Sequence, residues 1–217
     1  MFITFEGIEG SGKTTQMQKT ADFLKNAGYE VIVTREPGDT LIGKKIRSIL
    51  LDPENKNMSY LCELLLYVAD RVQHLYEVVE PGLAADKIVL CDRFIDSTIV
   101  YQGKARGLDT DLIEKIHGTG TGILDRFKPD LTVLFDLEPE TGLKRTFKAL
   151  KNGQREENET RFEQENIKFH KKVRQGYLEL ALKEKSRFLI VDASLEPDQV
   201  LNRITAGIRE WFPFMKF

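Results

Sequence analysis

The chain has few cysteines, no long apolar stretch and no excess of charge of one sign. Its two cysteines, Cys62 and Cys91, are too few for a disulfide framework or a cysteine metal cluster, which favours a reducing cytoplasm. No apolar run approaches the roughly 20 residues that cross a bilayer, and the first residues do not form a secretory signal. The 32 basic and 34 acidic residues leave a net charge of −2, so we expect neither a membrane nor a nucleic-acid partner.

The composition is that of an ordinary globular protein, with 41% hydrophobic and 30% charged residues among 217. This length suits one domain that spans residues 1–217. Short apolar strands alternate with longer helical segments, which favours an α/β fold with a mostly parallel sheet. We expect strands at Phe2–Glu6, Val31–Val33, Ile88–Cys91, Leu131–Phe135 and Phe188–Val191. We expect helices at Thr14–Asn26, Leu41–Leu51, Tyr60–Val79, Asp111–Ile116, Glu140–Leu150, Phe162–Leu182 and Gln199–Trp211.

The segment after the first predicted strand matches the phosphate-binding pattern G-x-x-x-x-G-K-[ST]. It reads Gly7, Ile8, Glu9, Gly10, Ser11, Gly12, Lys13 and Thr14, and Thr15 continues it into a helix. Glycines allow a turn whose backbone N–H groups face one anion, and the positive end of the following helix points to the same place. Lys13 is expected to reach the β- and γ-phosphates, and the Thr14 hydroxyl to bind magnesium. The motif therefore predicts a site for a nucleoside triphosphate and Mg²⁺.

Three predicted strands end in a carboxylate, the group that phosphoryl-transfer sites place near magnesium. These residues are Asp92, Asp136 and Asp192. Spacing alone does not choose between them, because each can also cap the next helix. Arg93 directly follows Asp92, and a guanidinium binds phosphate with a planar, two-pronged fork. We therefore expect Asp92 to lie at the metal and Arg93 at a substrate phosphate.

A second group of polar residues follows two of the strands or lies on the long predicted helix. Tyr67 and Arg71 are four residues apart and share a helix face, where they could stack on and hydrogen-bond a base. A surface cation–π pair, or packing against a loop, fits the pattern equally well. The other members are Arg35, Glu36, Pro37, Arg47, Ser97, Thr98, Tyr101 and Gln102. Each alone fits turn chemistry, but together they indicate a second, phosphorylated acceptor.

The segment 151–165 is almost purely polar and separates two predicted helices. Composition alone favours a solvated surface loop. The alternative is a mobile lid that carries Arg155 and Arg161 over the active site.

Taken together, these motifs resemble the thymidylate kinase family, and the resemblance runs nearly end to end. The matching stretches are Phe2–Gly7, Thr34–Gly38, Ala69–Arg71, Cys91–Phe94, Asp96–Ser97, Tyr101–Gly103 and Pro129–Thr132. The resemblance implies a P-loop kinase fold, with a five-stranded parallel sheet flanked by helices on both faces and a short lid at about 151–161. It implies a homodimeric enzyme that uses ATP and Mg²⁺ to phosphorylate dTMP to dTDP for dTTP synthesis, by direct transfer.

Carried over by position, the resemblance also implies roles for individual residues. Arg71 is expected to hydrogen-bond the thymine carbonyl and Tyr67 to stack on the base. Tyr101 is expected to crowd the 2′ position of the sugar, and Glu9 to reach the 3′-hydroxyl side. Further expectations place Ser97 and Gln102 at the base and sugar, Arg35, Arg47 and Arg93 around the acceptor phosphate, Asp92 at magnesium directly or through water, and Arg145 near the adenine.

The variable positions of the phosphate loop hold no arginine, so the resemblance implies that the lid supplies one, from Arg155 or Arg161. Two positions depart from the family pattern: Asp39 stands where glycine is common, and Tyr67 where phenylalanine is usual. Two rival functions stay open at this point. One is a kinase for another nucleoside monophosphate, such as UMP or AMP, and the other is a nucleotide-operated switch or ATPase that binds a protein partner.

Overall fold

The computed structural model describes residues 1–120, 126–153 and 159–216. Its centre is a five-stranded parallel sheet with the order β2-β3-β1-β4-β5, which confirms the predicted fold class. The strands are β1 (Phe2–Gly7), β2 (Val31–Arg35), β3 (Ile88–Asp92), β4 (Leu131–Asp136) and β5 (Phe188–Asp192). Each runs one or two residues past its predicted end, because the polar residue after the apolar run still pairs with the neighbouring strand, as Arg35 does with Asp92.

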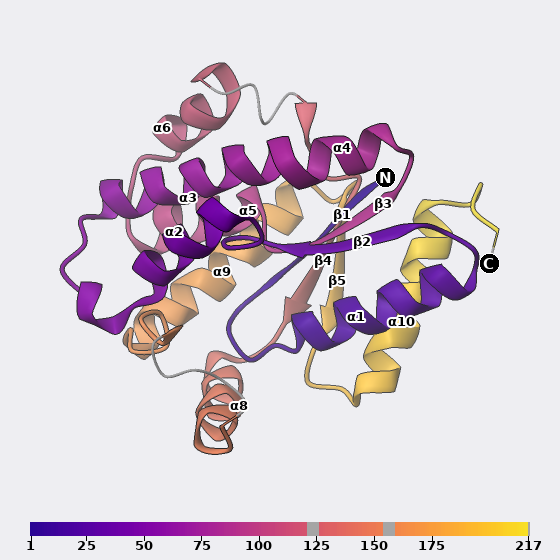
Figure 1. Ribbon diagram of the computed structural model, residues 1–217. Coiled ribbons are helices and arrows are strands. Elements are labelled where there is room, and N and C mark those ends of the chain that lie inside the picture. The colour runs from indigo at the N-terminus through magenta and orange to yellow at the C-terminus, as the bar shows by residue number, and fades with distance from the viewer. Residues whose placement is uncertain (121–125, 154–158, 217) are drawn as a thin grey trace.

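Helices cover both faces of this sheet (Figure 1). On one face α1 (Lys13–Asn26) packs beside α10 (Pro197–Trp211), and on the other α4 (Glu80–Ala84), α5 (Ile95–Thr98) and α9 (Ile167–Lys183) contact β3, β1 and β4. The other helices are α2 (Leu41–Leu51), α3 (Tyr60–His74), α6 (Thr110–Lys115) and α8 (Pro139–Lys151). Short 3₁₀ or π-helical turns lie at Pro53–Asn55, Leu75–Val79, Ile99–Ala105 and Ile116–Gly120.

The alternation of side chains along β1 explains why the core has two layers. Ile3 and Phe5 point to one face, where they pack in the same cluster as Met17 of α1. Phe2 points to the other face and meets Phe94 edge to face, with ring centroids 5.0 Å apart. A short apolar strand that is buried on both faces is what a central strand of a parallel sheet requires.

Two helices differ from the sequence prediction by more than two residues at one end. α9 begins at Ile167 rather than Phe162, because the side chain of Asn166 accepts a backbone N–H of the first turn and caps the helix there. The single helix predicted over Tyr60–Val79 changes to a π-helical turn at Leu75–Val79 before α4. Among the helices of the described residues, none is long and apolar enough to span a bilayer.

Candidate active site

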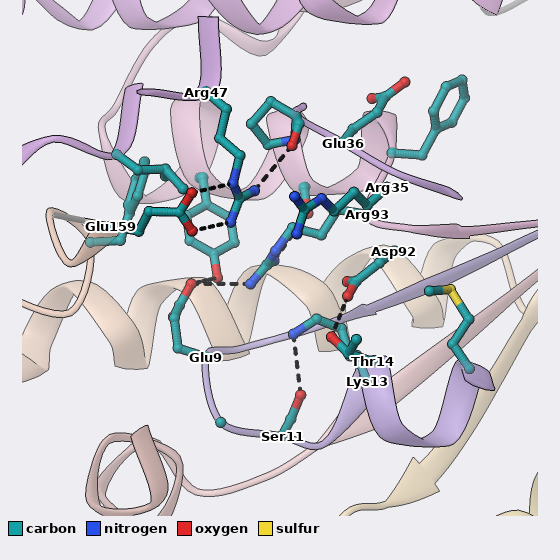
Figure 2. Close-up of a pocket in the computed structure, with 18 of the residues that line it drawn as sticks. Glu9, Ser11, Lys13, Thr14, Arg35, Glu36, Arg47, Asp92, Arg93 and Glu159 are labelled. Atoms are coloured by element: carbon teal, nitrogen blue, oxygen red, sulfur yellow. Dashed lines mark hydrogen bonds and ion pairs between the residues drawn. The ribbon is translucent and has the colours of Figure 1, made fainter. Parts of the chain in front are cut away.

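A cavity of about 760 Å³ opens at the carboxyl ends of the central strands, the place where parallel sheets bind ligands. The phosphate loop and the first turn of α1 form one wall. The loops after β2 and β3, together with one face of α3, form the opposite wall. Figure 2 shows side chains from these segments pointing into one space.

The phosphate loop follows β1 directly and leads into α1. Gly10 and Gly12 have φ angles of 69° and 88°, in the left-handed region that glycine adopts without strain. The buried Lys13 folds back over the loop, and its Nζ donates to the carbonyl oxygens of Gly7 at 3.0 Å and Ile8 at 2.8 Å. The loop therefore places an ammonium and the N-terminus of a helix at one edge of the cavity, an arrangement that suits a polyphosphate.

Thr14 and Asp92 come from different elements and meet in the cavity. Thr14 Oγ1 donates to Asp92 Oδ2 at 2.7 Å (Figure 2). The two other strand-end carboxylates do not line the cavity. Asp136 accepts from Arg174 at 2.6 Å, and Asp192 accepts a backbone N–H of the turn that follows it. Of the three candidates, Asp92 is the one in the cavity wall.

Arg93 turns back over the phosphate loop because its backbone is left-handed. Its φ angle is 72°, which is uncommon outside glycine. Nη2 then donates to Glu9 Oε1 at 3.1 Å, Nη1 donates to Ser97 Oγ at 3.2 Å, and the guanidinium lies 5.0 Å from the centroid of the Tyr101 ring. A left-handed backbone at a residue other than glycine costs conformational free energy, and functional sites retain such strained conformations.

Glu9 is only 9% exposed and lies among the groups that Arg93 reaches. Its Oε1 accepts the Tyr101 hydroxyl at 2.6 Å, and its Oε2 lies 3.4 Å from Nδ1 of His170. Burial alone would raise the pKa of Glu9, but the contact with His170 and the charges of Arg93 and Lys13 hold that pKa below its usual range. Glu9 is therefore a fixed negative charge inside the cavity.

Arg71 is 1% exposed and is held from two sides. Its Nε donates to Glu36 Oε2 at 2.7 Å, and its Nη1 donates to Thr98 Oγ1 at 3.0 Å. Burial would raise the pKa of Glu36, but the charge of Arg71 and the bond from His74 lower it, so Glu36 is a carboxylate. The alternative of a surface cation–π pair is wrong for Arg71, because its side chain is buried at the cavity wall.

Two further arginines are occupied by carboxylates. Arg47 lines the cavity and forms a bidentate ion pair with Glu159, at 2.8 Å and 2.7 Å (Figure 2). Arg161 pairs with the fully buried Glu63 at 2.7 Å and also donates to the carbonyl of Leu50. Arg161 does not line the cavity.

Comparison with known proteins identifies the family. The family model described as thymidylate kinase matches residues 5–204. The chain is 60% identical to a thymidylate kinase of Desulforapulum autotrophicum over 208 residues, which cover 96% of this chain and 90% of that protein. The chain belongs to the thymidylate kinase family.

Other members of the thymidylate kinase family agree in sequence and in structure. A thymidylate kinase of Desulfosudis oleivorans is 51% identical over 208 residues, which cover 96% of each chain. The crystal structure of the thymidylate kinase from Ehrlichia chaffeensis has a TM-score of 0.74 at 32% identity, and the match covers 96% of this chain and 98% of that one. The fold is therefore the P-loop kinase fold that the resemblance implied.

Membership of the thymidylate kinase family decides between the rival functions. The chain is an enzyme, and its reaction is the phosphorylation of dTMP to dTDP for dTTP synthesis. A UMP or AMP kinase and a nucleotide-operated switch are thereby set aside. Thymidylate kinases generally use ATP with Mg²⁺.

The cavity residues fit magnesium. Mg²⁺ in kinases binds one or two carboxylates together with substrate phosphates, and Thr14 with Asp92 offers a hydroxyl and a carboxylate oxygen 2.7 Å apart. Among the described residues no group of three or more His, Cys, Asp or Glu side chains is placed to hold a metal ion by itself.

The structure brings most of the predicted site residues to the cavity wall. The predicted residues that line it are Glu9, Gly10, Ser11, Gly12, Lys13, Thr14, Thr15, Arg35, Glu36, Pro37, Arg47, Tyr67, Arg71, Asp92, Arg93, Ser97, Thr98, Tyr101, Gln102 and Arg145. Gly7 and Ile8 of the phosphate loop do not line the cavity, and neither does Arg161, which pairs with Glu63. Arg155 lies outside the described residues.

The sequence reasoning assigned no site role to the histidines. The chain has three, at most 1% exposed, and each contacts a predicted site residue. His74 meets Glu36, His170 meets Glu9, and His117 meets Arg71. The feature of the sequence that could have drawn attention to these histidines is their scarcity. The spacing of motifs could not, because it does not reveal contacts between distant segments.

Proposed function

We propose that this cavity transfers the γ-phosphoryl group of magnesium-bound ATP directly, in line, to the phosphate of dTMP. The observation that carries the proposal is the 2.7 Å contact of Thr14 with Asp92, which Arg93 directly follows. Groups suited to the metal of the donor and to the phosphate of the acceptor are thus neighbours in one cavity. Because the acceptor is itself a phosphate oxygen, no protein nucleophile is needed, and catalysis consists of positioning and charge neutralisation.

On the donor side, Lys13 and the backbone N–H groups of the phosphate loop bind the β- and γ-phosphates. Thr14 and Asp92 would hold Mg²⁺, which would neutralise charge on those phosphates. Arg145 lies near the adenine, and its Nη1 is anchored on the carbonyl oxygen of Ala193 at 3.0 Å. Removal of water from this site protects ATP from hydrolysis.

On the acceptor side, the base and the phosphate of dTMP lie at different arginines. Arg71 donates to a thymine carbonyl while Tyr67 stacks on the ring, and Tyr101 crowds the 2′ position, which disfavours ribose. The Glu9 carboxylate accepts a hydrogen bond from the 3′ hydroxyl of the sugar. The residues proposed around the sugar, base and phosphate also include Arg35, Glu36, Pro37, Arg47, Arg93, Ser97, Thr98 and Gln102, all in the cavity wall.

The lid residue is proposed from the sequence. The variable positions of the phosphate loop hold no arginine, so we propose that Arg155 supplies a positive charge to the transferring phosphoryl group. Arg161 fills the same role only if it leaves its ion pair with Glu63. Replacement of each in turn by alanine, followed by measurement of kcat, separates the two.

The acceptor assignment is tested by ADP formation from ATP and Mg²⁺ with dTMP, dUMP, UMP, AMP, CMP or GMP offered separately. A reaction without acceptor is the control. We expect turnover with dTMP to exceed that with every other acceptor, and little ADP in the control. Equal ADP in all reactions would mean plain ATP hydrolysis, and the proposed acceptor site would then be wrong.

We further propose that the enzyme is a cytoplasmic homodimer that needs no nucleic acid and no membrane. α2 and α3 pack beside each other and expose apolar side chains that the domain core does not use, among them Ile42, Ile49, Leu61, Leu65 and Val72. An apolar face of this kind marks a protein interface. Leu65→Lys is expected to yield monomers in sedimentation velocity, whereas Leu182→Lys, at an exposed leucine of α9, should leave the dimer intact.

A further inference from the structure

His117 contacts a residue of the cavity wall, Arg71, from a part of the chain that the motifs do not include. It lies in the turn Ile116–Gly120 that follows α6 and is fully buried. Its Nε2 lies 2.8 Å from Nη1 of Arg71, although 46 residues separate the two in sequence. Arg71 is the residue to which the proposed function assigns recognition of the base.

The hydrogen bonds of His117 require one particular state of its ring. An arginine nitrogen can only donate, so Nε2 accepts and carries no proton. Nδ1 lies 2.8 Å from the carbonyl oxygen of Ile113, which can only accept, so Nδ1 carries the proton. The imidazole is therefore neutral, with its proton on Nδ1. Burial, followed by the charge of Arg71, lowers the pKa of His117 to about 4, so the ring stays neutral over the pH range in which kinases are assayed.

The contact with His117 completes the set of groups that hold Arg71. Glu36 binds Nε, while Thr98 and His117 both accept from Nη1. The guanidinium also lies 5.1 Å from the ring centroid of Phe94. Two of its three nitrogens are thus engaged within the described protein. Nη2 is the nitrogen left to face a ligand in the cavity that Arg71 lines.

We propose that His117 is a positioning residue for the acceptor base, which fixes the guanidinium of Arg71 so that Nη2 points at a carbonyl of the pyrimidine. The proposal rests on the proposed base-binding role of Arg71. A neutral hydrogen-bond acceptor suits the position of His117, because Glu36 already balances the charge of Arg71. A second carboxylate at this position would compete with the ligand for the guanidinium. His117 does not touch the substrate, so it acts on binding through Arg71.

Three replacements of His117 separate positioning from simple packing. His117→Gln can place a carbonyl oxygen near the position of Nε2 and so still accept from Arg71. His117→Asn is the matched control, because its shorter amide reaches the position of Nδ1 but not that of Nε2. His117→Leu removes both contacts. We expect His117→Asn and His117→Leu to raise KM for dTMP about tenfold. In both variants kcat and KM for ATP should stay within threefold of the parent. His117→Gln should keep KM for dTMP within threefold of the parent.

A ligand without a base sharpens the test. 2-Deoxyribose 5-phosphate keeps the sugar and the phosphate of dTMP, so its inhibition constant should stay the same in all three variants. Thermal denaturation of each variant shows whether it is folded, and if the Leu variant does not fold, the Gln and Asn pair still decides. The proposal is overturned if the Asn variant matches the parent in KM for dTMP, or if Gln is no better than Asn.

Arg71→Lys distinguishes failure of this proposal from failure of the proposed function. If Arg71→Lys leaves KM for dTMP unchanged, Arg71 does not read the base and both proposals are wrong. If Arg71→Lys raises that KM while His117→Asn does not, only the role of His117 is wrong.

Discussion

Arg47 and Glu159 form a bidentate ion pair inside the active-site cavity. Nε and Nη2 of Arg47 donate to the two carboxylate oxygens, and Nη1 donates to the carbonyl oxygen of Pro37 at 3.0 Å. A carboxylate and a phosphate present similar oxygen pairs to a guanidinium. Glu159 therefore occupies the guanidinium of Arg47 that we propose for the acceptor phosphate, so Glu159 and that phosphate must compete for Arg47.

Glu159→Gln should lower KM for dTMP by about two- to fivefold. The neutral amide competes less well for Arg47, and exposed or half-exposed ion pairs contribute about 0.2–1 kcal/mol. Initial rates over a range of dTMP concentrations at constant ATP provide the measurement. Glu140→Gln is the control, because Glu140 pairs with Lys171 at 2.8 Å on the surface and should change nothing. A higher KM in Glu159→Gln would show that Glu159 helps to bind the acceptor.

Lys13→Ala should reduce kcat by about 10²–10³, the range found for removal of one preorganised donor from a transition state. Lys13 is buried over the phosphate loop and is proposed to bind the β- and γ-phosphates. Lys19→Ala provides the control, because Lys19 lies on the same helix but pairs with Asp198 at the surface. Steady-state turnover with saturating ATP and dTMP is the measurement. Near-parental turnover in Lys13→Ala would remove the lysine from the mechanism.

The enzyme should lose efficiency with ATP as the pH rises above about 8. Burial, followed by the charge of Arg93, lowers the pKa of Lys13 to about 8. The ammonium form is present below that pH and binds phosphate, and the neutral amine above it does not. We expect kcat/KM for ATP to be constant from pH 6.5 to 7.5 and to fall towards pH 9. A profile that stays flat to pH 9.5 would contradict the shift, and Lys13→Ala should lack the decline.

The folded protein should become less stable as the pH rises from about 5 to 8. Burial, followed by Asp96, raises the pKa of Glu6 to about 7, and burial, followed by Glu36, raises the pKa of Asp70 to about 7, whereas the unfolded chain has ordinary values of 4.5 and 3.8. In this window the folded state binds more protons, so protonation stabilises it at low pH and the contribution disappears as the pH passes 7.

The urea midpoint at constant protein concentration measures this pH dependence. Asp70→Asn keeps an oxygen that can accept the N–H of Gly38, as Oδ1 does now at 3.0 Å, and should flatten the dependence by about half. Asp22→Asn, at an exposed position of α1, should leave the slope unchanged. A midpoint that rises from pH 5 to 8 would mean that other carboxyl groups dominate.

Features that depend on neighbouring residues were predictable. The phosphate loop lies between an apolar strand and a helix because glycine, lysine and threonine spacing encodes that turn locally. The order of strands and helices followed from short apolar runs. α2 begins at Leu41 as predicted, and in the structure the Thr40 side chain caps it by accepting from the N–H of Gly43. The predicted end of each strand was too early because interstrand pairing, which local pattern does not show, extends the strands into polar residues.

By itself, the sequence determined the alternating α/β order, the phosphate loop and the family, because each is written in contiguous stretches. The adjacent Arg93 already favoured Asp92 over Asp136 and Asp192. Only the tertiary structure showed that Asp92 lines the cavity and that the other two carboxylates do not. It also decided that Glu63 holds Arg161 and that His117 meets Arg71. Such contacts join segments far apart in the chain, and burial selects for most polar groups a partner that no local pattern names.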